Sequence, residues 1–328
     1  MRPIKDIFTE EYWDVLYRSV ESPQKGIFGG CKGKFRCVGS GLRYWYADPF
    51  LFEDKGELYL FAEFFDNKAE IGRIGCLKYK NGKFTEPTVV ISENFHMSYP
   101  YVFKRDGIIY MMPETCLSRK LQLYKAIEFP YKWEQCRTIF DGVEYVDSVI
   151  YKDFIISNKR YWPEDSLSVD LNIYDFETGQ PHRMNPIAVK SYCDRGAGAV
   201  FEMNGEPVRP VQNSVGKVYG KSIVFKKIKK LDIDNFEQEE FFTFSHDMIN
   251  YDKSQQPGGT HTYAFLNGME IVDVKLKRFN PKRIFWILLR RLKGENSAAK
   301  MTDEEWRKFN EMKAKEKAEK ISADNKIS

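Results

Sequence analysis

Long hydrophobic runs are absent from this sequence of 328 residues. The longest apolar stretch is IFWILL at 284–289, whereas a membrane-spanning helix needs about 20 such residues. The N-terminal stretch MRPIKDIFTEEYWD has no apolar segment that could act as a signal peptide. These absences predict a cytoplasmic protein that does not span a membrane.

Metal-binding and phosphate-binding motifs are absent as well. No CxxC pair or zinc-ligand spacing occurs among the six cysteines, at positions 31, 37, 76, 116, 136 and 193. The four histidines lack metal-ligand spacing, and GGCKGK at 29–34 does not have the spacing of a phosphate-binding loop. DID at 232–234 matches a glycosyltransferase metal motif, but no nucleotide-binding βαβ unit precedes it. We therefore expect reduced thiols, no metal and no cofactor.

Charge is unevenly placed along the chain. Residues 277–328 carry 15 Lys/Arg against 8 Asp/Glu, a net charge of +7, and the total of +4 leaves the first 276 residues at −3. A nearly neutral body lacks the positive field that binding to nucleic-acid phosphates requires. We therefore expect no nucleic-acid partner.

Aromatic residues and strand-like runs are abundant. The chain has 19 Tyr and 25 Phe, which favour strands. A first strand, a turn ending in Gly and a second strand recur in ADPFLFEDKGELYLFAE (47–63), YPYVFKRDGIIYMMPE (99–114), AGAVFEMNGEPVRPVQ (197–212) and HTYAFLNGMEIVDVK (261–275). DSVIYKDFIIS (147–157) is a less regular copy. The chain therefore contains five copies of one unit.

The spacing of these copies predicts the fold class. Their first strands start at 48, 99, 147, 197 and 261, and further runs supply third and fourth strands. Four strands in about fifty residues are typical of a propeller blade. We predict an all-β fold, a five-bladed β-propeller over 1–277 whose N-terminal strands close the last blade. A short α-helical C-terminal extension follows, with a basic amphipathic segment at 278–294 and a charged helical tail at 295–328.

The start of each first strand is expected to face the central channel. The residues there are Asp48, Tyr99, Asp147, Ala197 and His261, with Glu63 and Glu114 on the adjoining strands. Converging carboxylates suit acid–base chemistry at an acetal centre. The alternative is that these acids cap strand ends or only hold water in the channel, and His261 would then be packed within a blade.

The fourth copy adds polar residues to this predicted site, namely Arg195, Arg209 and Gln212. An arginine inside a strand needs an anionic partner, which is either a carboxylate of the protein or a phosphate of a sugar donor. Both alternatives stay open at this point. The predicted substrate-binding residues are Glu63, Tyr99, Arg195, Arg209, Gln212 and His261.

The combined motifs resemble one family. ADPFLFEDKGELYLFAE, HMSYPYVFKRDGIIYMMPET, LYKAIEFPYKW, VDSVIY, EPVRPVQNSVGKVYGKSIVFKKI and GGTHTY resemble the N-terminal domain of plant glucosamine inositolphosphorylceramide transferases and its free-standing bacterial relatives. The resemblance covers about residues 12–277. That group is similar to the five-bladed propellers of furanosidases, fructosidases and mannoside phosphorylases. In those enzymes a first-blade aspartate is the base or nucleophile, a third-blade aspartate tunes the pair and a glutamate is the acid.

The resemblance implies catalytic roles for Asp48, Asp147 and Glu114. Asp48 and Asp147 match the two aspartates by blade, but Glu114 lies in blade two, and blade four has Arg209 and Gln212 where the hydrolases usually have their acid. It also implies a glycosyltransferase of bacterial surface-polysaccharide or glycolipid assembly. The partners would be a sugar donor (a nucleotide sugar or sugar phosphate) and a glycan or glycolipid acceptor. The alternatives are a furanosidase-like hydrolase or phosphorylase, and a non-catalytic glycan-binding scaffold.

The segment KLKRFNPKRIFWILLRRLKG, residues 275–294, predicts an amphipathic helix starting near Pro281. Residues 277–293 carry seven Lys/Arg and no acid. A wide apolar face edged by cations fits a helix in the surface of an anionic membrane, so we expect a peripheral location at the inner face of the membrane. The alternative is that the apolar face packs on the propeller.

Overall fold

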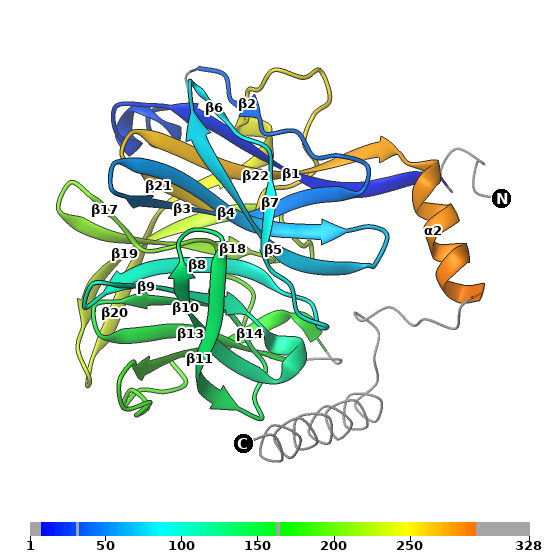
Figure 1. The fold of residues 1–328 in the computed structure, drawn as a ribbon. Coiled ribbons are helices and arrows are strands. Elements are labelled where there is room, and N and C mark those ends of the chain that lie inside the picture. Colours follow the sequence, from blue (N-terminus) through cyan, green and yellow to red (C-terminus); the bar gives the residue numbers. More distant parts are fainter. Residues whose placement is uncertain (1–7, 31–32, 162–164, 293–328) are drawn as a thin grey trace, which may run out of the picture.

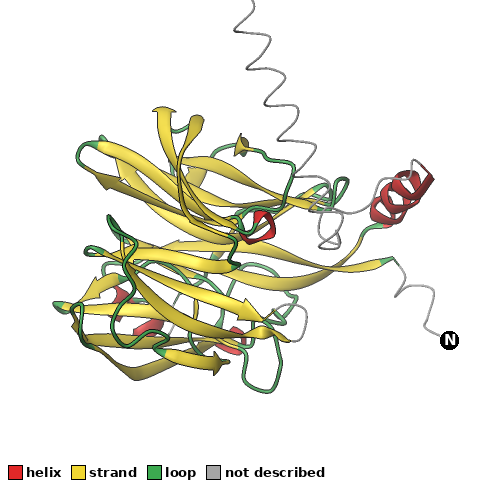
Figure 2. Cartoon of the chain, turned by 90° about the horizontal axis from the view of Figure 1, so that it is seen from below, coloured by secondary structure: helices red, strands yellow, loops and turns green. Residues whose placement is uncertain are grey.

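The structure, a computed structural model, describes residues 8–30, 33–161 and 165–292. Its strands form five antiparallel sheets, each with four strands in a continuous hydrogen-bonded path. Each sheet is one blade of a five-bladed β-propeller (Figures 1 and 2), which confirms the fold class predicted from the repeats.

The first two blades follow each other in the chain. Blade one contains β3 (Tyr44–Asp54), β4 (Glu57–Asp66), β5 (Ile71–Lys80), β6 (Lys83–Phe84) and β7 (Thr88–Ile91). Blade two contains β8 (Ser98–Arg105), β9 (Ile108–Glu114), β10 (Lys120–Glu128) and β11 (Lys132–Asp141). In both blades the first strand is the innermost one.

The next two blades keep this order. Blade three contains β12 (Tyr145–Tyr151), β13 (Phe154–Tyr161), β14 (Asp165–Asp175) and β15 (Ala188–Ser191). Blade four contains β16 (Arg195–Gly196), β17 (Phe201–Met203), β18 (Glu206–Asn213), β19 (Ser222–Leu231) and β20 (Phe236–Ser245). Short 3-10 turns lie at Pro23–Lys25, Ile27–Gly29, Cys116–Ser118 and His246–Met248.

The fifth blade joins the two ends of the described chain. It contains β21 (Tyr263–Leu266), β22 (Met269–Phe279), β1 (Thr9–Ser19) and β2 (Arg36–Cys37), in that order. The strand β1 pairs with β22 along its whole length, from Thr9 opposite Phe279 to Ser19 opposite Met269. Because an N-terminal strand lies inside a C-terminal sheet, the ring is closed without leaving β22 as an exposed edge.

The innermost strands of blades one to three share a β-bulge. The residue register slips by one between Ala47 and Phe50 in β3, and the same slip occurs in β8 and β12. The bulged residues Asp48, Tyr99 and Asp147 have left-handed φ angles of 50°, 48° and 48°. A bulge changes the direction in which the side chain of the bulged residue points. The bulges therefore redirect the side chains of Asp48, Tyr99 and Asp147 in the same way.

Aromatic packing fills the space within and between the blades. Phe61 and Phe64, both on β4, are fully or almost fully buried on opposite faces of blade one. The ring of Phe64 covers Gly75 on β5 so closely that an added Cβ there would lie 2.1 Å from it. This packing makes the blades a rigid frame for the channel side chains.

The helix α2 (Pro281–Leu292) follows β22 and stands at the side of the propeller (Figure 1). It begins at the proline that the sequence indicated. Within the described residues, no helix has both the length and the apolar character needed to cross a membrane. The charged tail predicted at 295–328 lies outside the described residues.

Candidate active site

Asp48 lies where blades one, two and five meet on the channel axis. Its Oδ1 accepts a hydrogen bond from the Thr262 hydroxyl at 3.0 Å, and its Oδ2 accepts one from the Tyr99 backbone N–H at 3.3 Å. His261 Nε2 lies 3.3 Å from Asp48 Oδ1. The aspartate in the apolar run YWYADPFLF therefore faces polar groups of the neighbouring blades.

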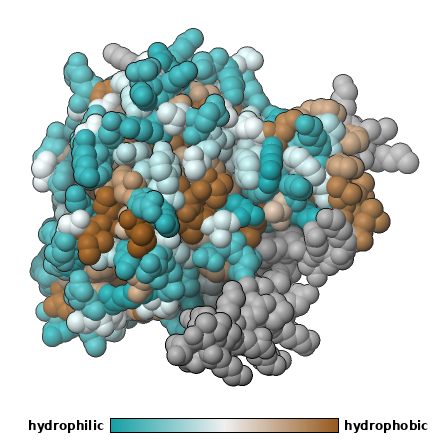
Figure 3. Space-filling view, viewed as in Figure 1, coloured by the Kyte–Doolittle hydropathy of each residue, from teal (hydrophilic) through white to brown (hydrophobic). Residues whose placement is uncertain are grey.

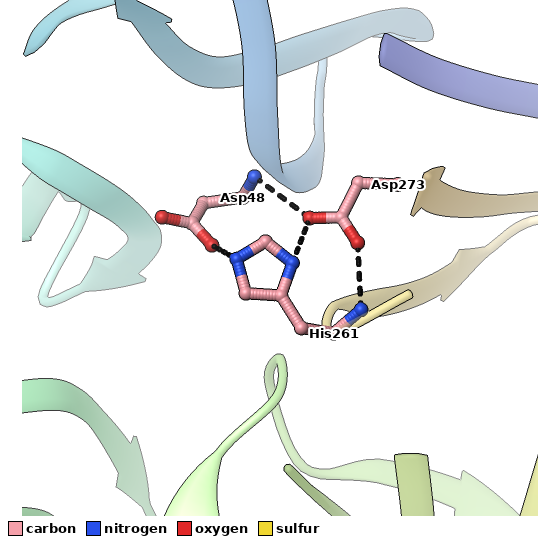
Figure 4. A group of neighbouring side chains, drawn as sticks. All are labelled: Asp48, His261 and Asp273. Carbon is pink, nitrogen blue, oxygen red and sulfur yellow. Dashed lines mark hydrogen bonds and ion pairs between the residues drawn. The ribbon is translucent and has the colours of Figure 1, made fainter. Parts of the chain in front are cut away.

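Asp273 on β22 holds the other side of His261 (Figure 4). Its Oδ1 accepts the backbone N–H groups of His261 and Thr262, both at 2.9 Å. Its Oδ2 lies 2.7 Å from His261 Nδ1 and accepts the Asp48 N–H at 3.2 Å. Asp273 was not predicted from the sequence, although an aspartate inside the apolar strand EIVDVK is the same signal that singled out Asp48.

The three side chains share one buried electrostatic environment. Burial raises the pKa of Asp48 to about 6, and repulsion by Asp147 and Asp273 adds to this effect while His261 opposes it. Burial disfavours a charged imidazole, but the carboxylates of Asp273 and Asp48 outweigh it and raise the pKa of His261. The two carboxyl groups beside His261 therefore favour its imidazolium form.

Asp48, His261 and Asp273 are also the residues that could hold a cation, since their ligand atoms lie within 4.8 Å of one another. Both ring nitrogens of His261 already face carboxylate oxygens. A metal ion would need the imidazole to lose a proton and one of these contacts. The donor set therefore fits an Asp–His–Asp ion-pair chain better than a resident metal.

Asp147 lies beside blade four. Its Oδ2 is ion-paired with Arg195 Nε and accepts a hydrogen bond from Gln212 Nε2 at 3.1 Å. Arg195 Nη2 also lies 3.6 Å from Glu114 Oε2. Burial raises the pKa of Asp147 to about 7, Arg195 lowers it and Glu114 raises it. The structure thus brings the predicted residues Asp147, Glu114, Arg195 and Gln212 together.

Glu63 occupies a less well-paired position next to His96. The His96 Nδ1 accepts the Gly72 N–H at 3.0 Å, so its Nε2 carries the proton and lies 3.3 Å from Glu63 Oε1. Burial, together with the charge of Arg160, lowers the pKa of His96 to about 4, so this histidine is neutral. Burial and repulsion from Asp48 and Glu114 raise the pKa of Glu63 well above its usual value. Glu63 is therefore a carboxylic acid that holds its proton at higher pH.

Tyr99 does not offer its side chain to the channel. The side chain is fully buried, its ring packs edge-on against Phe50, and its hydroxyl accepts the Gly198 N–H at 2.7 Å. Only its backbone N–H reaches Asp48. The predicted substrate contact is replaced by a brace between blades two and four.

Arg209 is likewise internal to blade four. Its residue exposure is only 1 %, and its guanidinium donates to the Asp194 carbonyl and, at 3.2 Å, to Gln238 Oε1. The Asp194 carboxylate lies 3.6 Å away. Of the two alternatives for this arginine, the structure shows the internal partner, which corrects the predicted contact with a donor phosphate.

Two aromatic residues near His261 were not predicted from the sequence. Trp13, on the closing strand β1, has its ring centroid 4.0 Å from that of His261. Tyr219, in the loop before β19, lies 5.1 Å from the same imidazole, and Arg195 lies over its ring at 5.8 Å. Trp13 is 248 residues away from His261 in the chain, so only ring closure brings it to this site.

Comparison with known proteins identifies one family. Residues 39–261 match the sequence profile described as glucosamine inositolphosphorylceramide transferase 1, N-terminal. The chain is 31 % identical to glucosamine inositolphosphorylceramide transferase 1 of Arabidopsis thaliana over 213 residues, and 30 % identical to that of Oryza sativa subsp. indica over 203 residues. These matches cover 59 % and 58 % of this chain but only 27 % of each relative. The chain thus spans about a quarter of these curated relatives.

Solved structures with similar folds are more distant. The catalytic domain of a Coprinopsis cinerea alpha-L-arabinofuranosidase matches with a TM-score of 0.47 and 9 % identity, covering 70 % of this chain and 90 % of that domain. An endo-arabinase from Bacteroides thetaiotaomicron matches with a TM-score of 0.47 and 14 % identity, covering 72 % and 93 %.

Proposed function

Because this chain belongs to the family of the N-terminal domain of glucosamine inositolphosphorylceramide transferase 1, we propose that it is a carbohydrate-active enzyme that transfers a glycosyl unit. The observation that carries this proposal is the set of buried carboxyl groups on the channel axis, which differ in their hydrogen bonding and in the pKa that burial gives them. Carboxyl pairs with separated pKa values are the usual acid and base of glycosyl chemistry.

Asp48 has the properties of the base. Its carboxylate is held in place by the Thr262 hydroxyl, the Tyr99 N–H and His261, and its pKa of about 6 leaves it ionised at neutral pH. It can accept the proton of an attacking acceptor hydroxyl while His261 and Asp273 keep it oriented.

Glu63 has the properties of the acid. It stays protonated at higher pH than an ordinary glutamate, and the neutral His96 beside it places an N–H against one of its oxygens. The proton on the other oxygen can pass to the leaving-group oxygen of the donor. Asp147, paired with Arg195 and Gln212, then serves to set the charge of the site. The sequence suggested Glu114 for the acid role, which it retains as a second candidate.

The charge of the site bears on where a donor phosphate binds. Asp48, Glu63, Glu114, Asp147 and Asp273 are all buried there. The cations His261 and Arg195 each already face two of these carboxyl groups. These buried carboxyl groups would repel a phosphate. A nucleotide sugar or sugar phosphate would therefore bind with its sugar inward and its phosphate toward the outer part of the channel. The relatives' names support a glycolipid acceptor, and the setting proposed for this chain is glycolipid or surface-polysaccharide assembly in the cytoplasm.

The test is Asp48→Asn, with Asp54→Asn on the same strand as its matched control. Asp54 is at the turn end of β3 and pairs with Lys104 at 3.5 Å. Turnover with a sugar donor and a glycolipid or glycan acceptor should fall by roughly 10² or more in Asp48→Asn and stay near the parent value in Asp54→Asn. Melting temperatures establish that both variants fold.

The same assay separates the alternatives. Release of free sugar without an acceptor, abolished by Asp48→Asn, would make the protein a hydrolase and contradict transfer. Glycan binding that is equal in parent and Asp48→Asn, with no turnover in either, would make it a binding scaffold.

A further inference from the structure

Polar contacts attach the helix α2 to the propeller at both of its ends. Asn280, buried just before the helix, accepts the Arg283 N–H and donates to Glu10 Oε1 at 2.9 Å. Arg283 Nε lies 3.7 Å from Glu10 Oε2. Near the other end, Arg290 Nη2 lies 2.9 Å from Glu70 Oε2. Polar contacts at both ends therefore fix which side of the helix faces the body.

The opposite side of α2 is apolar and exposed. Phe285, Leu288 and Leu292 follow one another at helical spacing and are 60 %, 52 % and 84 % exposed. Phe279, just before the helix, is 61 % exposed. Figure 3 shows a group of hydrophobic residues at the edge of the molecule, where α2 lies in Figure 1. The other apolar residues of the helix, Ile284, Trp286, Ile287 and Leu289, are half-buried, so Phe285, Leu288 and Leu292 form an apolar stripe beyond the side that packs toward the body.

We infer that this outward face, formed by Phe279, Phe285, Leu288 and Leu292, lies in the surface of an anionic lipid bilayer. The charges near it agree with this partner, because residues 277–292 contain six Lys/Arg and no Asp/Glu. Four of these cations face acids of the propeller, since Lys277 pairs with Glu11, Arg278 and Arg283 with Glu10, and Arg290 with Glu70. Lys282 is exposed beside the stripe, and the side chain of Lys277 is 66 % exposed despite its ion pair. An apolar face of this kind inserts at the level of the headgroups, where basic side chains meet anionic phosphates.

The size of the face favours a bilayer over a second copy of the chain. A helix of 12 residues is about 18 Å long and about 10 Å wide. One side of it offers roughly 200 Å², well below the roughly 800 Å² per partner that a stable protein interface buries. Shallow insertion into lipid has no such minimum area.

The experiment is co-sedimentation of the full chain with phosphatidylcholine vesicles that contain or lack phosphatidylserine. The test variant is Phe285→Ser/Leu288→Ser. The matched control is Val189→Ser/Val215→Ser, which removes two apolar side chains that are 61 % and 51 % exposed on other parts of the propeller. A third variant, Lys282→Glu, tests the charge. Thermal melting shows that each variant keeps the folded propeller.

The full chain should bind the vesicles that contain phosphatidylserine and lose binding as salt increases. Phe285→Ser/Leu288→Ser should weaken binding by tenfold or more, Lys282→Glu by about fivefold or more, and the control by less than twofold. Equal binding by the test and control variants, or no binding by the parent, would overturn the inference. If the parent self-associates without lipid and Phe285→Ser/Leu288→Ser does not, the face is occupied by a second copy and the membrane is the wrong partner. None of these outcomes depends on catalysis.

Discussion

Arginine side chains at two positions in blade four show how burial decides what a charged residue does. Arg195 has a side chain that is 16 % exposed and pairs with Asp147 and Glu114 of other blades. Arg209 is enclosed by groups of its own blade, chiefly Asp194 and Gln238. The sequence places both arginines beside a predicted site, but residue type alone cannot show which of them reaches the channel.

The contrast predicts different results for Arg209→Met and Arg195→Met. Removing Arg209 leaves the Asp194 carbonyl and carboxylate with fewer partners, and breaking a buried ion pair in this way costs about 3–5 kcal/mol. Arg209→Met should therefore lower the stability in denaturant titration without a specific effect on the pH profile of turnover. Arg195→Met leaves the buried Asp147 carboxyl without its ion pair, so it should lower the stability as well, but it should also change turnover and its pH profile. Unfolding of Arg209→Met at the parental denaturant midpoint would show that the arginine has no structural role.

Other residues of the site could be predicted from single positions in the chain. Asp48 and Asp147 follow from an aspartate in an apolar strand, because a buried carboxylate needs polar partners. Asp273 carries the same signal and could have been found. Trp13 and Tyr219 could not, since their proximity to His261 depends on how the ring closes and on the path of a loop.

At the scale of elements, the hairpins repeat more faithfully than the innermost strands. The spacing of strand, glycine turn and strand predicted every blade, because alternation and turn glycines follow from local backbone chemistry. The bulges at Asp48, Tyr99 and Asp147 were not predicted. One extra residue in a strand shifts the pairing register between the strands and gives that residue a positive φ angle. The strand stays apolar, so its residue composition does not reveal the bulge.

Blade four does not repeat this one-residue slip, and its Gly198 lies directly against blade five. Its φ is 136°, and an added Cβ would lie 2.1 Å from the Tyr263 carbonyl oxygen of blade five. Gly198→Ala should therefore destabilise the protein by about 3 kcal/mol or more. Gly205→Ala, in the turn of the same blade with φ 75° and open space where an added Cβ would lie, should cost only about 1 kcal/mol. If Gly198→Ala and Gly205→Ala unfold at the same temperature and at the same denaturant concentration, the close contact between blades four and five is contradicted.

At the scale of the whole molecule, the channel concentrates buried acids. Burial raises the pKa values of Asp48, Asp147 and Glu63, and His261 is raised by its carboxylate neighbours despite burial. The folded protein therefore binds protons that the unfolded chain has already released. His96 acts in the opposite direction, because burial lowers its pKa to about 4.

These shifts predict how stability changes with pH. A raised folded-state pKa contributes stability at low pH that is lost as the pH rises through that pKa. Asp147 titrates at about 7 in the folded state, so stability should rise when the pH is lowered from 8 to 6.5, and this carboxyl contributes about 0.8 kcal/mol to the rise. His96 opposes part of this rise, because the unfolded imidazole takes up a proton near its ordinary pKa of about 6.5 while the folded one stays neutral. Below pH 6.5 this opposing effect grows, and the gain should level off.

The measurement is the unfolding free energy of the parent and of Asp147→Asn from pH 5 to 8. The variant keeps the shape of the side chain but cannot take up the proton, so the rise between pH 8 and 6.5 should become smaller. Asp175→Asn is the control, because this half-buried carboxyl has a lowered pKa set by hydrogen bonds from Thr178 and does not titrate in that window. The dependence of the unfolding free energy on pH could be unchanged in Asp147→Asn, or could weaken equally in both variants. Either result would mean that the channel acids are not the source of the pH dependence. The acid–base roles proposed for the channel carboxyls would then lose their electrostatic basis, whatever the turnover of the Asp48 variant.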